Sequence, residues 1–175
     1  MRAQVGLNLG CGDHAHLGGD AWLNVDRHDL PHWQQPPDVI ANVLAGLPFP
    51  ADRFSSVYLG HILEHLGFDD EIPVLWAELR RVCRPGAVLR VVGPCVDKAQ
   101  ALGLNPGWIA TWSQPSDDPS GCVHRWTPTT DATMTAVRQV DPQASEIPVW
   151  SVQPPDWPNA APNAAWQVAV AATVP

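Results

Sequence analysis

Two short segments near the start of the chain carry residue types suited to binding a nucleoside. The first runs from Val5 to Asp13 and reads VGLNLGCGD, an apolar run that ends in a turn with two glycines. The second, Leu23-Asn24-Val25-Asp26, ends in a carboxylate. Glycine has no Cβ, so the backbone of such a turn approaches a ligand closely, and a carboxylate accepts hydrogen bonds from both hydroxyls of a ribose. Because ligands bind at the carboxyl ends of strands in open α/β sheets, the pair predicts a cofactor that contains a nucleoside.

Composition bounds the class of protein. The 175 residues suffice for one domain with a buried core, and 45% of them are hydrophobic. The formal net charge of −8 argues against a nucleic-acid partner, since such proteins carry a basic surface. No apolar run approaches the length that spans a bilayer, and the first strand begins within five residues of Met1, which argues against a signal peptide. We therefore expect a cytoplasmic monomer or homodimer without a nucleic-acid or membrane partner.

The elements that must position these residues follow from hydrophobic patterning. Short apolar runs rich in Val and Leu predict buried parallel strands at Val5–Leu9, Trp22–Val25, Asp38–Ile40, Ser56–Leu59 and Ala87–Val92. The clearest helix is Pro73–Cys83, because proline suits a first helical turn and Leu75, Leu79 and Val82 share one face. A shorter helix is expected over His61–Leu66.

The second half of the chain has a weaker pattern. Residues 94–127 lack periodicity and are expected to form a long, lid-like loop. A helix is predicted over Thr127–Val140, with Thr127 or Thr129 as its cap, followed by an antiparallel hairpin of Ile147–Val152 and Ala165–Ala172. Since 13 residues separate Gly12 from Asp26, the first crossover helix is expected to be short or absent.

Five motifs occur in one order at workable spacings. They are Asn8-Leu9-Gly10-Cys11-Gly12, Asn24-Val25-Asp26, Leu47-Pro48-Phe49-Pro50, His61-Ile62-Leu63-Glu64-His65-Leu66 and Glu78-Leu79-Arg80-Arg81-Val82-Cys83-Arg84-Pro85-Gly86. Together they resemble class I S-adenosylmethionine-dependent methyltransferases, above all the small members with HxLEHL followed by an ELxRVLxPGG-like run. The resemblance implies an α/β, Rossmann-like, doubly wound and mostly parallel seven-stranded sheet with an antiparallel C-terminal hairpin. It implies one domain over residues 1–175, with a cofactor-binding core (5–93), the lid-like loop (94–127), and a C-terminal helix and edge strands (128–175).

The resemblance also implies roles for individual residues toward S-adenosyl-L-methionine. Gly10 and Gly12 would approach the ribose and the amino-acid half, and Asp26 would accept from the ribose hydroxyls. Asn42 stands where many relatives have an Asp that holds the adenine amine, and its amide oxygen can still accept, with Val43 beside the ring.

The resemblance places Gly60 and His61, just after the fourth strand, at the methionine end of the cofactor.

The sequence departs from the family pattern at two positions: Asn8 replaces an acidic residue, and His14 replaces the third glycine of the first motif. The full set of expected cofactor contacts is Asn8, Gly10, Cys11, Gly12, Asp26, Arg27, Asn42, Val43, Gly60 and His61.

The implied reaction is methyl transfer to a small molecule, for example a saccharide or another metabolite. No Asp/Asn-Pro-Pro-Tyr/Phe signature follows the fourth strand, which removes one common class of nucleic-acid and protein methylation. His61 is the candidate base, with His124 behind it. The N-terminal helices that cover the substrate in many relatives are not expected here, so residues 94–127 or a second subunit would close the pocket. Trp126 and Thr127 are expected to be structural at a helix entry, while Trp108, Trp112 and also Trp126 are candidates for an aromatic rim.

Alternative functions remain open at this point. One is a catalytically silent cofactor-binding module or partner subunit, and another is a nicotinamide oxidoreductase, which the incomplete GxGxxG disfavours. A third is a zinc metallopeptidase, because residues 61–65 match HxxEH, with His61 and His65 as ligands and Glu64 as base. That motif follows directly on a predicted strand, and Glu146 is the sole distant glutamate to complete it. The other histidines (His14, His16, His28 and His32) are loosely spaced and the four cysteines form no CxxC pair, so no metal site is expected.

Overall fold

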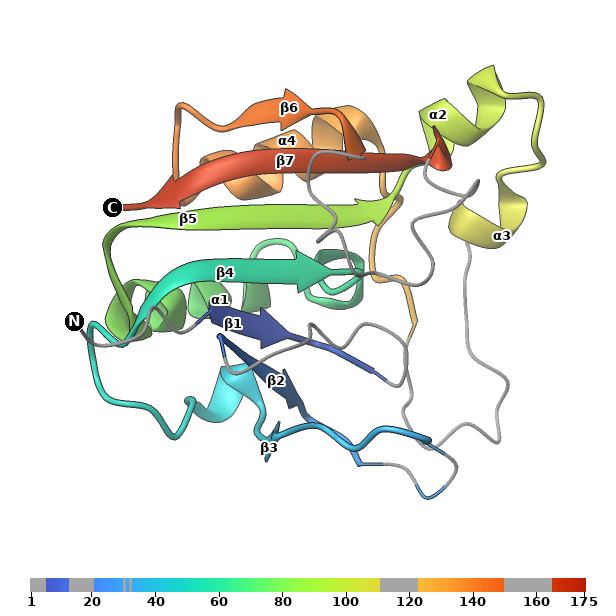
Figure 1. Cartoon of the computed structure of the whole chain (residues 1–175). Helices are drawn as coiled ribbons and strands as arrows, with labels where there is room; N and C mark the ends of the chain where they lie inside the picture. The colour runs from blue at the N-terminus through green and yellow to red at the C-terminus, as the bar shows by residue number, and fades with distance from the viewer. Residues whose placement is uncertain (1–5, 13–20, 30, 32, 111–122, 150–164) are drawn as a thin grey trace.

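Seven strands form one sheet in the order β3-β2-β1-β4-β5-β7-β6 in this computed structural model (Figure 1). The structure describes residues 6–12, 21–29, 31, 33–110, 123–149 and 165–175. The strands are β1 (Gly6–Leu9), β2 (Trp22–Asp26), β3 (Val39–Ile40), β4 (Phe54–Gly60), β5 (Cys83–Pro94), β6 (Ser145–Ile147) and β7 (Gln167–Val174). Strands β1 to β5 pair in parallel, whereas β7 is antiparallel to both β5 and β6. The expected α/β fold class, with its antiparallel C-terminal hairpin, is confirmed.

Strand register determines which residues meet at the edge of the sheet. All four residues of β1 are buried, as is typical of a central parallel strand. Leu9 at the end of β1 lies opposite both Val25 of β2 and Leu59 of β4. The residues that come next along each strand, Gly10, Asp26 and Gly60, therefore meet at the same edge.

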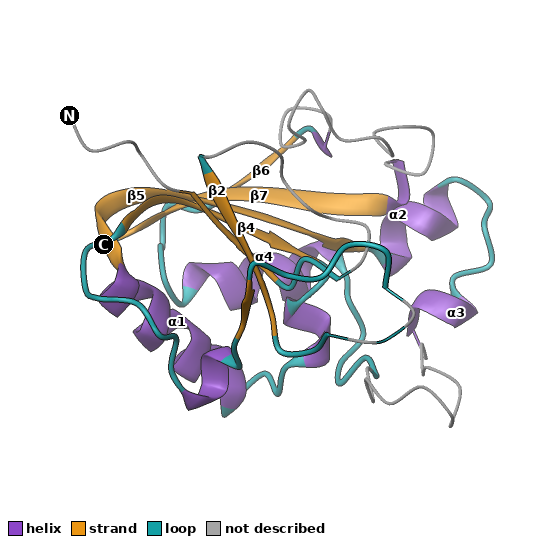
Figure 2. Cartoon of the chain, turned by 60° about the horizontal axis from the view of Figure 1, so that its bottom comes forward, coloured by secondary structure: helices purple, strands orange, loops and turns teal. Residues whose placement is uncertain are grey.

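Two helices cover one face of the sheet (Figure 2). Helix α1 spans Glu71–Val82 and helix α4 spans Thr130–Arg138. They lie side by side, because the indole nitrogen of Trp76 donates a 3.0 Å hydrogen bond to the carbonyl of Ala136. The apolar stripe predicted for α1 is buried as expected (Leu75, Leu79 and Val82 are each 0% exposed) and belongs to the main core.

Capping side chains set the start of both helices. The side chain of Asp70 accepts from the amide of Glu71 at 2.9 Å, so α1 begins two residues before the expected Pro73. The hydroxyl of Thr129 accepts from the amide of Ala132 at 3.1 Å, which assigns the cap of α4 to Thr129 rather than Thr127.

The structure corrects the expected loop and one expected helix. Helices α2 (Val96–Ala101) and α3 (Gly107–Ala110) lie within the stretch predicted to be a loop, and a small buried cluster that includes Val96, Ala99 and Ile109 holds them. Such short helices have too few turns to show periodicity. Residues 61–66 form only the 3₁₀ turn η2 (Leu63–His65), and a second turn η1 (Val43–Ala45) follows β3. The remainder of the expected lid, 111–122, lies outside the described residues.

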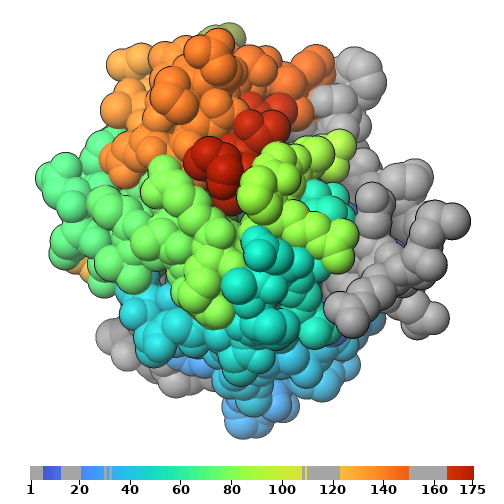
Figure 3. Space-filling model, turned by 90° about the vertical axis from the view of Figure 1, so that its left-hand side faces the viewer, coloured from blue at the N-terminus to red at the C-terminus, as the bar shows by residue number. Residues whose placement is uncertain are grey.

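The C-terminal hairpin is shifted along the sequence. Strand β6 pairs Ser145 with Ala171 and Ile147 with Ala169, and Pro148, which has no amide hydrogen for the ladder, follows at once. The strand expected over Ile147–Val152 includes Ile147, which is in β6, but was wrong for 148–149. Residues 150–152 and the first crossover at 13–20 lie outside the described residues. Seen from the amino ends of the parallel strands, the last residues of β7 lie between the α4 region and the start of β5 (Figure 3). Among the described residues, no helix has the length and apolar character to cross a bilayer.

Candidate functional site

The turn after β1 and the carboxylate at the end of β2 are joined directly. The amide of Gly12 donates to Oδ2 of Asp26 at 2.9 Å, and the amide of His28 donates to Oδ1 at 3.1 Å. Gly10 and Gly12 both have positive φ (75° and 51°), which glycine adopts without strain. Since a carboxylate offers about four lone-pair directions, Asp26 keeps acceptor capacity for two ribose hydroxyls.

The two glycines of the turn differ in how closely other atoms approach them. Among the described residues, a Cβ added at Gly12 would meet no atom within 4 Å, so none of them fills the space in front of that residue. A Cβ added at Gly10 would fall 2.2 Å from Cδ1 of Ile62, so the turn packs against the residues that follow β4. The open space, the partly exposed carboxylate and the close turn fit a nucleoside cofactor.

Asn8 lies in the sheet beneath the turn, where it is 0% exposed. Its Nδ2 donates to Oδ1 of Asn24 at 2.9 Å, and Nδ2 of Asn24 donates to Oδ2 of Asp38 at 3.0 Å. This polar chain ties β1, β2 and the residue before β3 together, and sequence reasoning missed Asn24 and Asp38. Their signal was present: polar residues inside otherwise apolar strands must find partners. The expected cofactor contact of Asn8 stays a prediction.

The remaining predicted cofactor contacts lie along the same edge. Cys11 is buried, and burial together with the nearby charge of Asp26 raises the pKa of its thiol to about 12. Asn42 caps η1, where its Oδ1 accepts from the amide of Leu44 at 3.0 Å, and Val43 is buried. Arg27 is exposed at the end of β2. The Asn42 oxygen is thus already engaged, which leaves one lone pair for the adenine amine.

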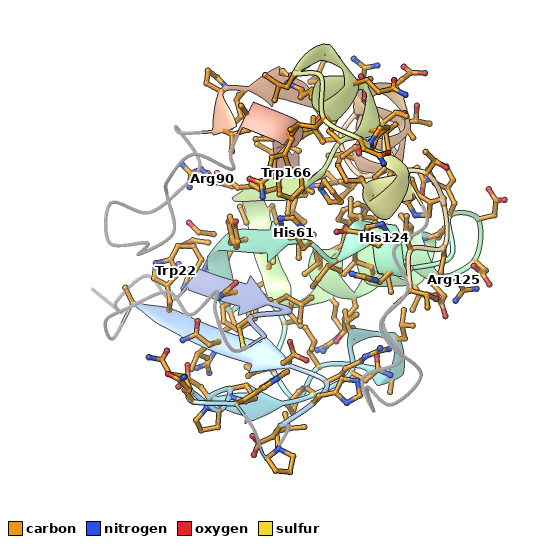
Figure 4. The ribbon with its side chains drawn as sticks, turned by 90° about the vertical axis from the view of Figure 1, so that its right-hand side faces the viewer. Trp22, His61, Arg90, His124, Arg125 and Trp166 are labelled. Carbon is orange, nitrogen blue, oxygen red and sulfur yellow. The ribbon has the colours of Figure 1, made fainter. Side chains whose placement is uncertain are left out.

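His61 holds an unusual position directly after β4. Its φ is +56°, a left-handed conformation that is uncommon for a residue with a side chain, and its amide donates to the carbonyl of Val92 at 2.8 Å. The ring lies between two side chains: Nε2 is 2.8 Å from Nε2 of Gln167, and Nδ1 is 3.5 Å from Oε1 of Glu64. The ring of Trp166 lies in a T-shaped arrangement with that of His61, with 6.0 Å between the ring centroids. Figure 4 labels both residues. Backbone strain of this kind concentrates at functional sites.

Glu64 is the buried partner of His61. Its side chain is 2% exposed, and such burial alone would raise the pKa of the carboxyl. Contact with His61 and the positive charges that His61 and His65 can carry outweigh the burial, so the pKa lies below its ordinary value. The glutamate of the HxxEH segment is thus a buried residue beside His61.

The segment before α4, residues 124–126, lies against the residues that follow β4, and its side chains have different roles. Trp126 donates from its indole nitrogen to the carbonyls of Leu63 and Leu66 at 3.0 and 3.1 Å, which confirms a structural role. Arg125 forms an ion pair with Glu71 at 2.7 Å.

His124 has a different environment from its neighbours in that segment. It is half-buried, and Nδ1 contacts the carbonyl of Ile109 at 2.6 Å. Burial lowers the pKa of its imidazole. The other aromatic candidates (Trp108 and Trp112) have no described side chain.

Comparison with known proteins shows what the sequence and the fold are similar to. A family model described as a methyltransferase domain matches residues 20–91. None of the curated proteins searched matches the chain. Among solved structures, a methyltransferase from Archaeoglobus fulgidus is similar with a TM-score of 0.62 at 13% identity, covering 98% of this chain and 86% of that one. A methyltransferase from Methanosarcina mazei gives 0.55 at 13% identity, covering 99% and 93%.

A third similar structure was solved with ligands. It is the 1,6-didemethyltoxoflavin-N1-methyltransferase of Burkholderia thailandensis with bound 1,6-didemethyltoxoflavin and S-adenosylhomocysteine. Its TM-score is 0.57 at 14% identity, and the match covers 99% of this chain and 72% of that one. The methyltransferase-domain model thus matches residues 20–91, and the solved structures show that this chain shares the fold of S-adenosylmethionine-dependent methyltransferases.

Proposed function

We propose that this chain transfers the methyl group of S-adenosyl-L-methionine to a small-molecule acceptor, with His61 as general base. The observation that supports this most is the contact between Gly12 and Asp26. It sets a ribose-binding carboxylate beside an open glycine turn, at the same sheet edge that carries His61 at the end of β4.

The roles of the residues follow from their chemistry. The cofactor, when bound, supplies an electrophilic methyl on a sulfonium. The glycine turn and Asp26 hold its ribose, and the buried Val43 lies where the adenine would rest. His61 exposes 40% of its side chain and is held by contacts at both ring nitrogens. An acceptor hydroxyl or amine that takes the place of Gln167 at Nε2 gives its proton to that nitrogen, while Glu64 faces Nδ1.

A small, partly apolar acceptor is the class that the surroundings favour. Trp166 stands against His61 and offers an aromatic face of the kind on which the C–H groups of a sugar or a heterocycle pack. The Burkholderia methyltransferase was solved with bound 1,6-didemethyltoxoflavin, a small molecule, which supports the same class here. The net charge of −8 supports an acceptor other than nucleic acid.

The peptidase alternative loses support in the structure. Residues 61–65 are not on an α-helix, and His61 precedes the turn η2. Glu146, on β6, forms an ion pair with Lys98 of α2 and not with the HxxEH segment. The silent-module alternative keeps the same cofactor site and differs only in turnover.

One experiment separates these possibilities. The chain is titrated with S-adenosylhomocysteine by calorimetry, and methyl transfer from radiolabelled donor is screened against saccharides and heterocyclic metabolites. We expect binding and turnover, with turnover lost in His61→Asn and binding kept, because asparagine tolerates the left-handed backbone but supplies no base. Binding without turnover on any acceptor would favour the silent module. Absence of binding would overturn the proposal.

A further inference from the structure

Three side chains converge beside the candidate site: Glu64, His65 and His124. One potential ligand atom from each lies within 4.8 Å of the other two. His65 and His124 are 59 residues apart in sequence, yet their ring centroids are 5.0 Å apart. A backbone hydrogen bond holds the two segments together, since the amide of Arg125 donates to the carbonyl of Glu64 at 2.7 Å. Figure 4 shows His124 and His61 at the same end of the sheet.

The carboxylate of this trio is buried, and one of its oxygens lacks a hydrogen-bond partner among the described residues. Glu64 is 2% exposed, and its Oε1 has no hydrogen-bond partner among the described residues. Nδ1 of His61 stands 3.5 Å away, at the outer limit of a hydrogen bond. A buried carboxylate oxygen left in this way is costly unless a cation completes its surroundings.

Both histidines are oriented by backbone carbonyls. Nδ1 of His65 lies 3.0 Å from the carbonyl oxygen of Val123, and Nδ1 of His124 lies 2.6 Å from that of Ile109. A carbonyl oxygen only accepts, so each Nδ1 carries the hydrogen and each Nε2 keeps its lone pair. Metal-binding histidines are held in this same manner, with the non-ligating nitrogen donating to a carbonyl or a carboxylate.

We propose that Glu64, His65 and His124 bind one divalent transition-metal ion of the Zn²⁺ class. Two imidazoles and one carboxylate are a recurrent ligand set for zinc, whereas Mg²⁺ and Ca²⁺ take oxygen ligands. Zinc bonds of about 2.1 Å place tetrahedral ligand atoms about 3.4 Å apart, so the trio closes by about 1 Å when it binds the ion. Three protein ligands leave a fourth position for water or another small ligand.

The metal ligands proposed here differ from those of the HxxEH peptidase pattern. There, His61 would be a ligand and Glu64 the base. Here Glu64 is itself a ligand, His61 stays outside, and His124 completes the set from a remote part of the chain. The site is independent of methyl transfer: it rests on the trio alone, and metal binding is measured without the cofactor.

The test uses the chain free of any histidine tag and stripped of metal with a chelator. Zn²⁺ is titrated by competition with a chromophoric chelator, and Co²⁺ is added separately to observe the visible absorption of a tetrahedral site. The variants are Glu64→Gln, His65→Gln and His124→Gln. The matched control is His28→Gln, because His28 is also half-buried but lies at the end of β2.

We expect one equivalent of tightly bound Zn²⁺ in the wild type and in His28→Gln, with affinity at least tenfold weaker in each trio variant. Unchanged zinc affinity in His65→Gln and His124→Gln would overturn the proposal, as would the absence of stoichiometric binding in the wild type. If Glu64→Gln fails to fold by circular dichroism, the half-buried His124→Gln decides the question. Titration of S-adenosylhomocysteine in the same samples keeps this outcome separate from that of the proposed methyltransferase function.

Discussion

The amide of Gly12 donates to the carboxylate of Asp26 at 2.9 Å, so the turn after β1 and the end of β2 form one hydrogen-bonded unit. A second amide, that of His28, holds the other carboxylate oxygen at 3.1 Å. The position of Asp26 is thus fixed by backbone before any ligand arrives. Preorganisation of this kind lowers the entropy cost of binding.

Replacing Asp26 by Ala is expected to weaken binding of S-adenosylhomocysteine by about 1.5–3 kcal/mol, which is about 10- to 150-fold in Kd. The loss comes from hydrogen bonds between ribose hydroxyls and a charged acceptor. Calorimetric titration measures it, with Asp69→Ala, an exposed residue before α1, as the control. Equal affinities in a folded Asp26→Ala variant and the wild type would mean that the ribose lies elsewhere.

Gly10→Ala is expected to destabilise the fold by about 2–4 kcal/mol. Part of this is the cost of a side chain at φ +75°, and the rest is a clash, since the new Cβ would lie 2.2 Å from Cδ1 of Ile62. Gly86→Ala isolates the first part, because Gly86 has φ +80° and no atom within 4 Å of an added Cβ. Urea unfolding measures the loss of stability in both variants, and the difference between the two losses is the free-energy cost of the clash. A loss no larger at Gly10 than at Gly86 would show that Ile62 moves aside freely.

Much of the sheet was readable from sequence because buried parallel strands leave a local signature. The runs around Leu7, Val25 and Leu59 are apolar and short, and each appears where expected. The convergence of Gly10, Asp26 and Gly60 follows from parallel pairing alone, so the sheet edge that carries the candidate site was predictable.

Other features depend on contacts between distant residues and left no local signal. The closeness of His124 to Glu64 and His65 is set by a segment some 60 residues further along the chain. Gln167, which contacts His61, lies at the start of the last strand, and only the antiparallel pairing of β7 with β5 brings it to the site. Helix α2 was missed because its six residues are too few to show a period.

Acid sensitivity is expected to depend in part on Glu78. A hydrogen bond from Arg81, together with the 2.6 Å bond from the amide of Leu47, lowers the pKa of this carboxyl below its model-compound value of 4.5. A depressed folded-state pKa contributes stability above the unfolded pKa, and that stability is lost as the pH falls through the folded value. Glu78→Gln should therefore lower stability at neutral pH and flatten its decline below about pH 4.5.

Urea titrations at several pH values measure this effect. Asp69→Asn serves as the control, since Asp69 is exposed at the surface before α1. A Glu78→Gln variant whose stability falls with acid as steeply as that of the wild type would assign the acid sensitivity to other carboxylates, such as Asp97 and Asp141, whose pKa values are also lowered.

The buried cysteines are expected to resist alkylation while the chain is folded. Burial raises the pKa of Cys11 and of Cys83 to about 12, so about one thiol in 10,000 is ionised at pH 8. Iodoacetamide reacts with the thiolate, so labelling at both positions should be about 1,000-fold slower than in urea. Mass spectrometry of tryptic peptides measures each site separately, in a Cys122→Ser background that removes a residue outside the described part of the chain. Rapid labelling of Cys11 alone in the native protein would show that the glycine turn opens to solvent, and the preformed contact between Gly12 and Asp26 would then be transient.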